Sequence, residues 1–363
     1  MTSILIKPCL EIILGIIVLF AGGEVFVQGA VTLSILLGVP QLVIGLTVIS
    51  LGTSAPELFV SAGSFFRGSD GLAVGNIVGS NIFNVLVVLG SSALILPIRV
   101  ESRLVKRDVP LLLAVSVAVW GMASSGRFSW QSGIALLIAL GINTAWEIRT
   151  AREEPQAIKE GEPEIHIEVG TNKWLKAFGK ILAGILILAF GSNILISGAK
   201  SLASSYGWSE TIIGLTIVSA GTSMPELITS TVAAIRGRTD LAIGNVIGSS
   251  LLNQLLVLGS CAVFAGSKGL AVEKILIERD FPIMILTVLA CMPIFWTKGK
   301  ISRSEGAILL FLYVLYILDQ IIPYTLPSLQ EELRIIIIYI IVPLICLIVL
   351  FKTINYWIGT RKV

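Results

Sequence analysis

The sequence GLTVISLGTSAPEL at residues 45–58 recurs as GLTIVSAGTSMPEL at residues 214–227. These stretches open two longer segments, 45–90 and 214–259, which align without gaps at an offset of 169 with 24 of 46 positions identical. Within them LAVGNIVGSNIFNVLVVLG matches LAIGNVIGSSLLNQLLVLG, and upstream Gly29-Ala30 falls on Gly198-Ala199. A match of this density indicates an internal repeat, and the fold is therefore expected to consist of two equivalent halves.

The composition places this repeat in a membrane. Hydrophobic residues make up 55% of the 363 and charged residues only 13%, whereas soluble domains carry about 25% charged residues. Apolar runs of membrane-spanning length recur along the chain, and each is expected to be mainly helical. The eleven expected spans are approximately 10–38, 40–66, 71–98, 107–125, 129–148, 178–206, 209–235, 240–265, 280–297, 303–322 and 333–355.

The parity of these spans relates the two copies. The upstream match extends the first copy into the first span and the second copy into the sixth span. Equivalent positions are therefore five spans apart, and because five is odd, the two copies enter the membrane from opposite sides. Such inverted repeats are typical of secondary transporters. We predict an all-α polytopic membrane protein of two inverted five-helix repeats, with ten core transmembrane helices and an extra C-terminal one. The predicted divisions are 1–148 (first repeat), 149–174 (polar linker), 175–322 (second repeat) and 323–363 (extra helix and tail).

The distribution of basic residues orients the predicted bundle. With the N-terminus outside, 18 of the 26 Lys and Arg residues fall in segments that lie inside. The positive-inside rule therefore predicts a cytoplasmic linker and C-terminus. The net charge of +3 gives no indication of nucleic-acid binding.

A proline and a carboxylate interrupt an apolar span in each copy. Pro56 removes one helical hydrogen-bond donor and opens the preceding turn, which frees the carbonyls of Gly52 and Thr53 if the helix unwinds. Glu57 adds a charge that costs on the order of 3 kcal/mol near the bilayer centre. The second copy repeats this pattern at Gly221, Thr222, Pro225 and Glu226.

Further polar residues follow helical spacing around the two glutamates and along the next span. They are Thr53, Ser54, Ser61, Asn76, Ser80 and Asn84, with the counterparts Thr222, Ser223, Ser230, Asn245, Ser249 and Asn253. Hydroxyl, amide, carbonyl and carboxylate oxygens are ligands for hard cations such as Ca2+ or Na+. Each feature alone is compatible with a kink, tight packing or a structural polar contact. Their coincidence in two inverted copies predicts an ion site.

Other classes of function fit the sequence less well. A serine triad needs a histidine, and His166, the single one, lies in the linker, so we expect no enzyme activity. A channel passes ions without a counter-ion, whereas an inverted repeat within one chain favours a carrier. A non-transporting scaffold would not need Glu57 or Glu226.

Three charged residues outside the motif are interpreted separately. Glu24 aligns with Asn193 and is interpreted as an interfacial or helix-packing residue, with gating of a pathway as the alternative. Asp70 and Asp240 lie near helix starts and are interpreted as N-caps.

The motifs GTSAPEL and GTSMPEL, each followed by GN-x-x-GS, resemble the two α-repeats of the cation/Ca2+ antiporter superfamily, in its prokaryotic sodium/calcium exchanger-like branch. The resemblance implies that Glu57 and Glu226 bind Ca2+ together with the Thr53 and Thr222 carbonyls. It implies flanking sodium sites, and a matching pair of amides on the third and eighth helices. The sodium-site residues are Ser54, Ser80, Ser223 and Ser249, with carbonyls near Ser50 and Ser219, and the amides are Asn84 and Asn253.

One position departs from the family pattern. In potassium-dependent exchangers the position of Asn253 is an Asp tied to K+ use, so Asn253 implies an exchanger that does not need K+. We therefore expect a cell-membrane antiporter that exchanges Na+ for Ca2+ by alternating access, with an H+/Ca2+ antiporter as the alternative. Its partners would be Ca2+, Na+ and the lipid bilayer, without a cofactor or an obligate protein partner.

Overall fold

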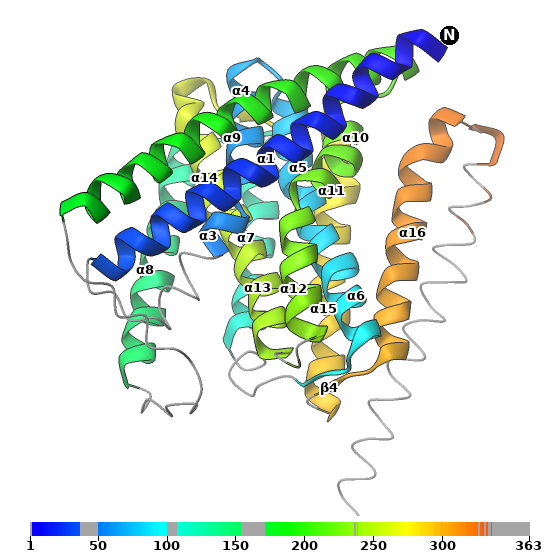
Figure 1. Cartoon of the computed structure of the whole chain (residues 1–363). Coiled ribbons are helices and arrows are strands. Elements are labelled where there is room, and N and C mark those ends of the chain that lie inside the picture. Colours follow the sequence, from blue (N-terminus) through cyan, green and yellow to red (C-terminus); the bar gives the residue numbers. More distant parts are fainter. Residues whose placement is uncertain are drawn as a thin grey trace, which may run out of the picture.

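The computed structural model describes residues 2–36, 50–99, 107–153, 171–235, 237, 239–298, 300–325, 327–329, 332 and 335, and most of them are helical (Figure 1). The first half contains α1 (Thr2–Leu36), α3 (Ser50–Thr53), α4 (Ala55–Phe66), α5 (Asp70–Phe83), α6 (Leu89–Ile95), α7 (Val109–Ala123) and α8 (Trp130–Glu153). The second half contains α9 (Thr171–Tyr206), α10 (Glu210–Ile213), α11 (Ser219–Thr222), α12 (Met224–Ile235), α13 (Thr239–Leu252), α14 (Gly259–Phe264), α15 (Phe281–Lys298) and α16 (Arg303–Thr325).

Several of these helices have the length and composition of membrane spans. They are the stretches Ile6–Gly29, Asp70–Ile95, Lys173–Ala203, Ala242–Phe264 and Arg303–Tyr324. A sixth is the pair Glu210–Thr222 and Met224–Ile235, bent by 44° at its break. Helices α7, α8 and α15 coincide with the predicted spans 107–125, 129–148 and 280–297. The predicted span 40–66 is described from Ser50 onward and the span 333–355 lies outside the described residues apart from Ile335, so the total of eleven stays a prediction.

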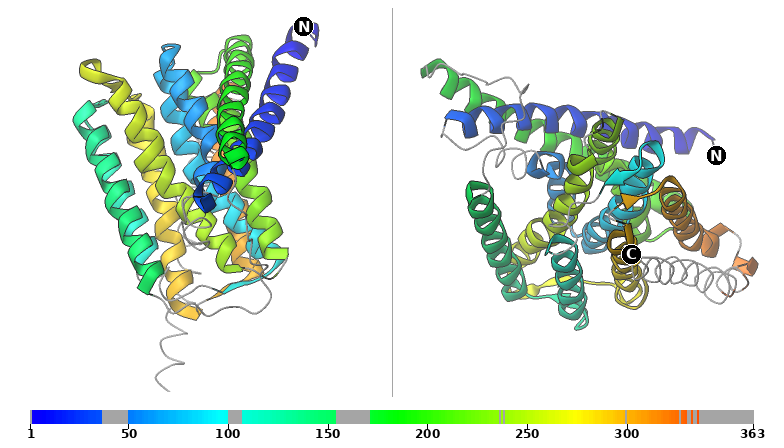
Figure 2. Two further views of the ribbon diagram at one scale, coloured as in Figure 1. Left: turned by 60° about the vertical axis from the view of Figure 1, so that its left-hand side comes forward. Right: turned by 90° about the horizontal axis from the view of Figure 1, so that it is seen from below.

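Helices α1 and α9 lie side by side across one face of the remaining helices (Figures 1 and 2). A glycine every seventh residue allows this close approach: Gly15, Gly22 and Gly29 on α1, and Gly184, Gly191 and Gly198 on α9. A Cβ at Gly22 would lie 2.9 Å from Leu188 N, and a Cβ at Gly191 would lie 2.9 Å from Leu19 N.

The glycine contacts are reciprocal at the sequence offset of 169. Gly15 faces Leu195 and Gly184 faces Phe26, while Gly29 faces Ile181 and Gly198 faces Ile12. Residue numbers rise along one helix as they fall along the other, so the two equivalent helices are antiparallel. This arrangement is what an inverted repeat requires, and small residues at the contact allow the backbones to pack closely.

The central helices behind this pair contain segments of π-helix. α5 continues through η2 (Asn84–Val88) into α6, and almost all of the residues in the apolar part of this run are buried. α13 continues through η5 (Asn253–Leu258) into α14. Two further π segments are η4 (Gly214–Val218), between α10 and α11, and η7 (Leu276–Asp280), before α15. Short 3₁₀ turns are η6 (Gly266–Lys268) and η8 (Pro327–Leu329).

Two short antiparallel strand pairs join the halves of the chain. β1 (Ile98–Arg99) pairs with β4 (Lys300–Ile301), and β2 (Arg127–Phe128) pairs with β3 (Leu270–Ala271). Because β3 precedes α15 and β4 follows it, the two pairs lie at opposite ends of this helix.

The interpretation of Asp70 as an N-cap is wrong. Asp70 is the first residue of α5, and the capping position is Ser69. The carboxylate of Asp70 accepts a hydrogen bond from the backbone N–H of Ala271 in β3 (2.9 Å), so it connects the start of α5 to a distant segment. The side chain of Asp240 lies outside the described residues.

Candidate ion-binding site

Each GTS-x-PE motif breaks its helix at one residue. Ser54 (φ −85°, ψ 4°) separates α3 from α4, and Ser223 (φ −87°, ψ 9°) separates α11 from α12. Pro56 and Pro225 then stand in the first turn of the next helix, where a missing N–H costs no intrahelical bond. The break is therefore shorter than the unwinding that the prolines predict, and the second half-helix restarts at once.

Both glutamates lie at the start of these second half-helices and are fully buried. Glu57 and Glu226 are each 0% exposed. Ser223 Oγ donates to Glu57 Oε1 at 2.8 Å, and Ser54 Oγ donates to Glu226 Oε1 at 3.3 Å. The serine that breaks each helix thus binds the glutamate of the other copy, which joins the two motifs into a single cluster with approximate two-fold symmetry.

The cluster contains polar atoms that are buried without a hydrogen-bond partner among the described residues. Burial of such groups costs free energy, and an accumulation of them in one place marks a site that binds something polar. All of them come in equivalent pairs. They are Glu57 Oε2 and Glu226 Oε2, Ser80 Oγ and Ser249 Oγ, and the Oδ1 and Nδ2 atoms of Asn84 and Asn253.

The two asparagines mark the start of the π segments. Asn84 opens η2 and Asn253 opens η5, at equivalent positions of the two copies. A π segment adds a residue to one helical turn, so it displaces the following side chains from their α-helical directions, and such segments occur frequently at functional sites. The sequence offers the repeated asparagine as a signal here, but the π geometry itself was not expected.

The polar stripe of the next helix also forms equivalent contacts. Asn76 Nδ2 donates to Ser61 Oγ at 2.9 Å, and Asn245 Nδ2 donates to Ser230 Oγ at 2.9 Å. Thr222 Oγ1 additionally donates to Asn76 Oδ1 at 3.1 Å, which connects α11 to α5. These bonds hold the broken helices against the helices that carry the unpartnered serines and asparagines.

The remaining predicted ligands are placed around the same cluster. Thr53 and Thr222 are buried beside the breaks (7% and 1% exposed). The carbonyl of Ser219 accepts from Thr222 Oγ1 at 3.2 Å, while its hydroxyl donates to Leu215 O at 2.8 Å. Ser50 begins α3, and its side chain lies outside the described part.

The charge of the cluster is not balanced by a basic side chain. Within the described part of the chain, no ion pair involves Glu57 or Glu226. The N-termini of α4 and α12 place partial positive charge at the two carboxylates, which offsets only part of the cost of their burial. A bound cation could supply the rest, with the unpartnered oxygens of the cluster as its ligands.

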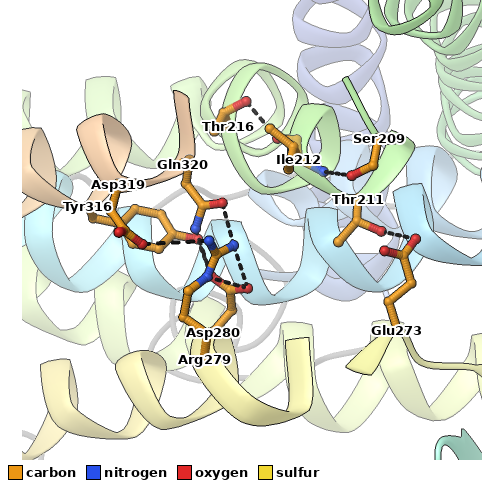
Figure 3. A network of polar contacts seen from close by, with 10 residues as sticks. All are labelled: Ser209, Thr211, Ile212, Thr216, Glu273, Arg279, Asp280, Tyr316, Asp319 and Gln320. Atoms are coloured by element: carbon orange, nitrogen blue, oxygen red, sulfur yellow. Dashed lines mark hydrogen bonds and ion pairs between the residues drawn. The ribbon is translucent and has the colours of Figure 1, made fainter. Parts of the chain in front are cut away.

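A second polar network lies outside this cluster, around the start of α15 (Figure 3). Asp280 accepts from Gln320 Nε2 (2.7 Å) and Tyr316 Oη (3.3 Å) and pairs with Arg279 (3.0 Å). Arg279 also pairs with Asp319 at 3.5 Å. Nearby, Thr211 donates to Glu273.

A looser version of this network occurs in the first half. Arg107 pairs with Asp108 at 3.6 Å and donates to Asn143 Oδ1 at 2.9 Å. Sequence reasoning missed both networks, although RDVP at 107–110 and RDFP at 279–282 were a signal that could have revealed them.

Comparison with known proteins identifies the family. The family model for the sodium/calcium exchanger protein matches residues 8–149 and 176–322. The chain is 34% identical over 312 residues to the putative antiporter CaxA of Alkalimonas amylolytica, covering 84% of this chain and 96% of that protein. It is 29% identical over 344 residues to the sodium/calcium exchanger MaX1 of Methanosarcina acetivorans, covering 85% of this chain and 97% of that one.

The fold agrees with a solved exchanger. The structure of the sodium-calcium exchanger NCX_Mj soaked with Na+ and Sr2+ superposes with a TM-score of 0.59 at 30% identity, covering 86% of this chain and 98% of that chain. The family match spans both repeats and leaves out only the linker and the two ends of the chain. The chain therefore belongs to the sodium/calcium exchanger family, whose members are membrane transporters.

Proposed function

We propose that this protein is a secondary antiporter that exchanges Na+ for Ca2+ by alternating access. The observation that carries the proposal is the pair of reciprocal bonds from Ser54 to Glu226 and from Ser223 to Glu57. These bonds leave the second oxygen of each buried carboxylate without a partner in the described residues. Two inverted halves thus contribute equally to one acidic cluster, as the midplane sites of inverted-repeat transporters require.

The composition of the cluster supports Ca2+ and Na+ as competing cargo. Two carboxylates match the charge of one Ca2+, and the hydroxyl and amide oxygens around them suit a hard cation. We propose Glu57, Glu226, Thr53 and Thr222 as Ca2+ ligands, with Na+ sharing the same carboxylates. The flanking Na+ ligands would be Ser54, Ser80, Ser223, Ser249, Asn84, Asn253 and the carbonyls near Ser50 and Ser219.

The number of acidic groups is compatible with transport. Among the described residues, no group of three or more His, Cys, Asp or Glu side chains could hold a metal ion. A carrier must release its ion on each cycle, so two carboxylates supplemented by neutral oxygens suit it better than a cage of charged ligands would. Because both carboxylates serve either cargo, Na+ and Ca2+ would occupy the site in turn.

Two finer features belong to the same proposal. Asn253 is neutral where potassium-dependent exchangers resembling this chain have an Asp, which favours exchange without K+. The distribution of Lys and Arg favours an outside N-terminus and a cytoplasmic linker.

The test is uptake of 45Ca2+ into proteoliposomes driven by a Na+ gradient, a pH gradient or a K+ gradient in parallel. We expect the Na+ gradient alone to drive uptake and K+ to have no effect. Uptake driven by pH instead would replace the proposal with an H+/Ca2+ antiporter, and conductive Ca2+ flux without counter-ion would replace it with a channel.

The matched variants are Glu57→Gln and Glu226→Gln, with Glu210→Gln as the control. Glu210 lies at the start of α10 and pairs with Lys200 at 3.5 Å, away from the cluster. Flux should be lost in the first two variants and retained in the control. Normal flux in either Glu57→Gln or Glu226→Gln would refute the site.

A further inference from the structure

Three buried polar side chains form a network beside the acidic cluster. Gln254 Nε2 donates to Asn81 Oδ1 at 3.1 Å and to Ser116 Oγ at 3.0 Å. Asn81 Nδ2 in turn donates to the carbonyl of Ile77 at 2.8 Å. Ser116 Oγ donates to the carbonyl of Leu112 at 2.8 Å. Gln254, Asn81 and Ser116 are each exposed by 2% or less, and the ion site described above does not use them.

The network connects three helical segments. Gln254 lies in η5, Asn81 in α5 and Ser116 in α7, and η5 packs against both of these helices. Gln254 directly follows Asn253, and Asn81 precedes Asn84 by about one helical turn. The two hydrogen bonds of Gln254 therefore fix the turn that begins at Asn253 against the helix that leads to Asn84.

The equivalent positions of the other copy carry no such network within the described part of the chain. α13 packs against η2 there, as α5 packs against η5 here. The RDVP and RDFP motifs align α7 with α15, since Arg107 falls on Arg279 at an offset of 172. The counterpart of the amide is apolar, and the hydroxyl of Ser250 is buried without a hydrogen-bond partner in the described residues. The counterparts of Gln254, Asn81 and Ser116 are Val85, Ser250 and Val288.

Stability alone does not explain the buried amide of Gln254. A buried amide costs free energy unless all of its polar atoms are bonded. Gln254 Oε1 is buried and has no hydrogen-bond partner among the described residues. Val85 shows that an apolar side chain fits the equivalent place, where it is 5% exposed within the hydrophobic core. A buried polar network can fix one arrangement of its helices at a cost in stability, which is a positioning role.

The π segment η5 gives this role a target. Asn253 opens η5, and both polar atoms of its side chain are buried without a partner among the described residues. A π segment is a rare geometry, so it depends on the contacts that surround it. In η5 these contacts include the two hydrogen bonds of Gln254, whereas η2 has Val85 at that place. The direction of the Asn253 side chain therefore depends on Gln254.

We propose that Gln254 is a positioning residue that holds Asn253 in the acidic cluster and thereby sets the affinity of the site for Na+. The inference rests on the proposed function, in which Asn253 is a flanking Na+ ligand. Loss of the Gln254 bonds frees the η5 turn, so Asn253 spends less time in its binding orientation and Na+ binding weakens. Ca2+ binding is affected less, because the proposed Ca2+ ligands lie on α3, α4, α11 and α12.

The first experiment measures displacement of bound 45Ca2+ by Na+ in the purified protein in detergent. Gln254→Val introduces the residue of the other copy. The Na+ concentration that displaces half of the Ca2+ should then rise roughly five- to tenfold, the effect of a lost hydrogen bond. Ca2+ affinity without Na+ should stay close to that of the unaltered protein. Asn81→Ala and Ser116→Ala each remove one acceptor, and each should give a smaller shift in the same direction.

Two variants separate positioning from a general loss of packing. Gln254→Met keeps the length of the side chain but not its hydrogen bonds, so it should reproduce the shift of Gln254→Val without leaving a cavity. Thr287→Val is the matched control. Thr287 lies on α15, is 7% exposed and donates within its own helix to the carbonyl of Met284 at 2.7 Å. Loss of this buried bond should leave Na+ displacement unchanged.

A double-mutant cycle tests whether Gln254 acts through Asn253. Asn253→Ala alone should raise the Na+ concentration needed for displacement. In that background Gln254→Val should add less than about twofold, because no ligand is left to position. An independent structural contribution of Gln254 would instead appear in full in the double variant.

The outcomes distinguish this inference from the proposed function. The inference is overturned, with Na+/Ca2+ exchange left in place, if the Gln254 variants displace Ca2+ at the same Na+ concentration as the unaltered protein. Equal losses of Na+ and Ca2+ affinity, a shift of the same size in Thr287→Val, or full additivity with Asn253→Ala would overturn it as well. Failure of Na+ to displace Ca2+ from the unaltered protein would refute the proposed function and the inference together.

Discussion

The two halves of this molecule carry the same motif in unequal surroundings. In the first half, Val60 and Asn76 are fully buried (0% exposed each), and α4 lies beneath α9. In the second half, the equivalent residues Thr229 and Asn245 are exposed and half-buried, and Met224 on α12 is 38% exposed. The difference follows the neighbours of each helix: α4 packs against α9, and α5 packs against α10, η4 and α11. Within the described residues α9 packs against α4 but not comparably against α12, so the two halves of the site are covered unequally.

The largest expected effect tests whether the halves contribute equally to the site. Glu57→Gln and Glu226→Gln should each reduce Na+-driven 45Ca2+ flux by roughly 100-fold or more, because loss of one partner from a buried charged cluster costs about 3 kcal/mol or more. The measurement is initial uptake into proteoliposomes at matched protein content. A large effect of one variant and a small effect of the other would break the symmetry of the site.

Much of the site was predictable because both copies are short, gapless and polar. The reciprocal bonds join the serine of each motif to the glutamate of the other, and the repeat had marked both kinds of residue. The antiparallel α1 and α9 follow from the odd number of spans. The equivalence of Asn84 and Asn253 was also readable, since identical amides in apolar helices rarely occur at the same offset by accident.

Other features depend on packing that a repeat does not encode. The break at Ser54 is one residue long because Pro56 falls in the first helical turn, where proline is tolerated. The π segments at Asn84 and Asn253 arise from the fit between helices, and local propensity does not predict them. The sequence also gives no indication that Asn76 is buried while Asn245 is half-buried, because burial depends on neighbouring helices: α5, which carries Asn76, packs against α10, η4 and α11.

The second prediction compares the two arginine–aspartate networks. Asp280 is 0% exposed and has three polar partners, whereas the Asp108 side chain is 15% exposed and its pair with Arg107 is 3.6 Å long. Asp280→Asn should lower the free energy of unfolding by about 3 kcal/mol, and Asp108→Asn by about 1 kcal/mol. Thermal unfolding in detergent measures both. Equal losses would mean that the two networks have similar weight despite their different burial.

The third prediction tests the part of the molecule that is most symmetric. A Cβ at Gly15 would lie 2.7 Å from Leu195 N, and a Cβ at Gly184 would lie 2.7 Å from Phe26 Cα. Gly15→Ala and Gly184→Ala should therefore each cost about 1–3 kcal/mol through overpacking. Gly179→Ala on the same α9 is the control, because no atom lies within 4 Å of its Cβ position. Alanine there should be neutral or slightly stabilising, and unequal losses at Gly15 and Gly184 would contradict a two-fold interface.

The smallest expected effect comes from the serines that connect the two motifs. Ser223 donates to Glu57 at 2.8 Å, while Ser54 donates to Glu226 at 3.3 Å. Hydrogen bonds to charged groups contribute about 1.5–3 kcal/mol and weaken with length. Ser223→Ala should therefore reduce apparent Ca2+ affinity by about tenfold, and Ser54→Ala should reduce it by less. Both affinities are measured by equilibrium 45Ca2+ binding in detergent. An equal loss in the two variants would contradict a difference in strength between the two bonds.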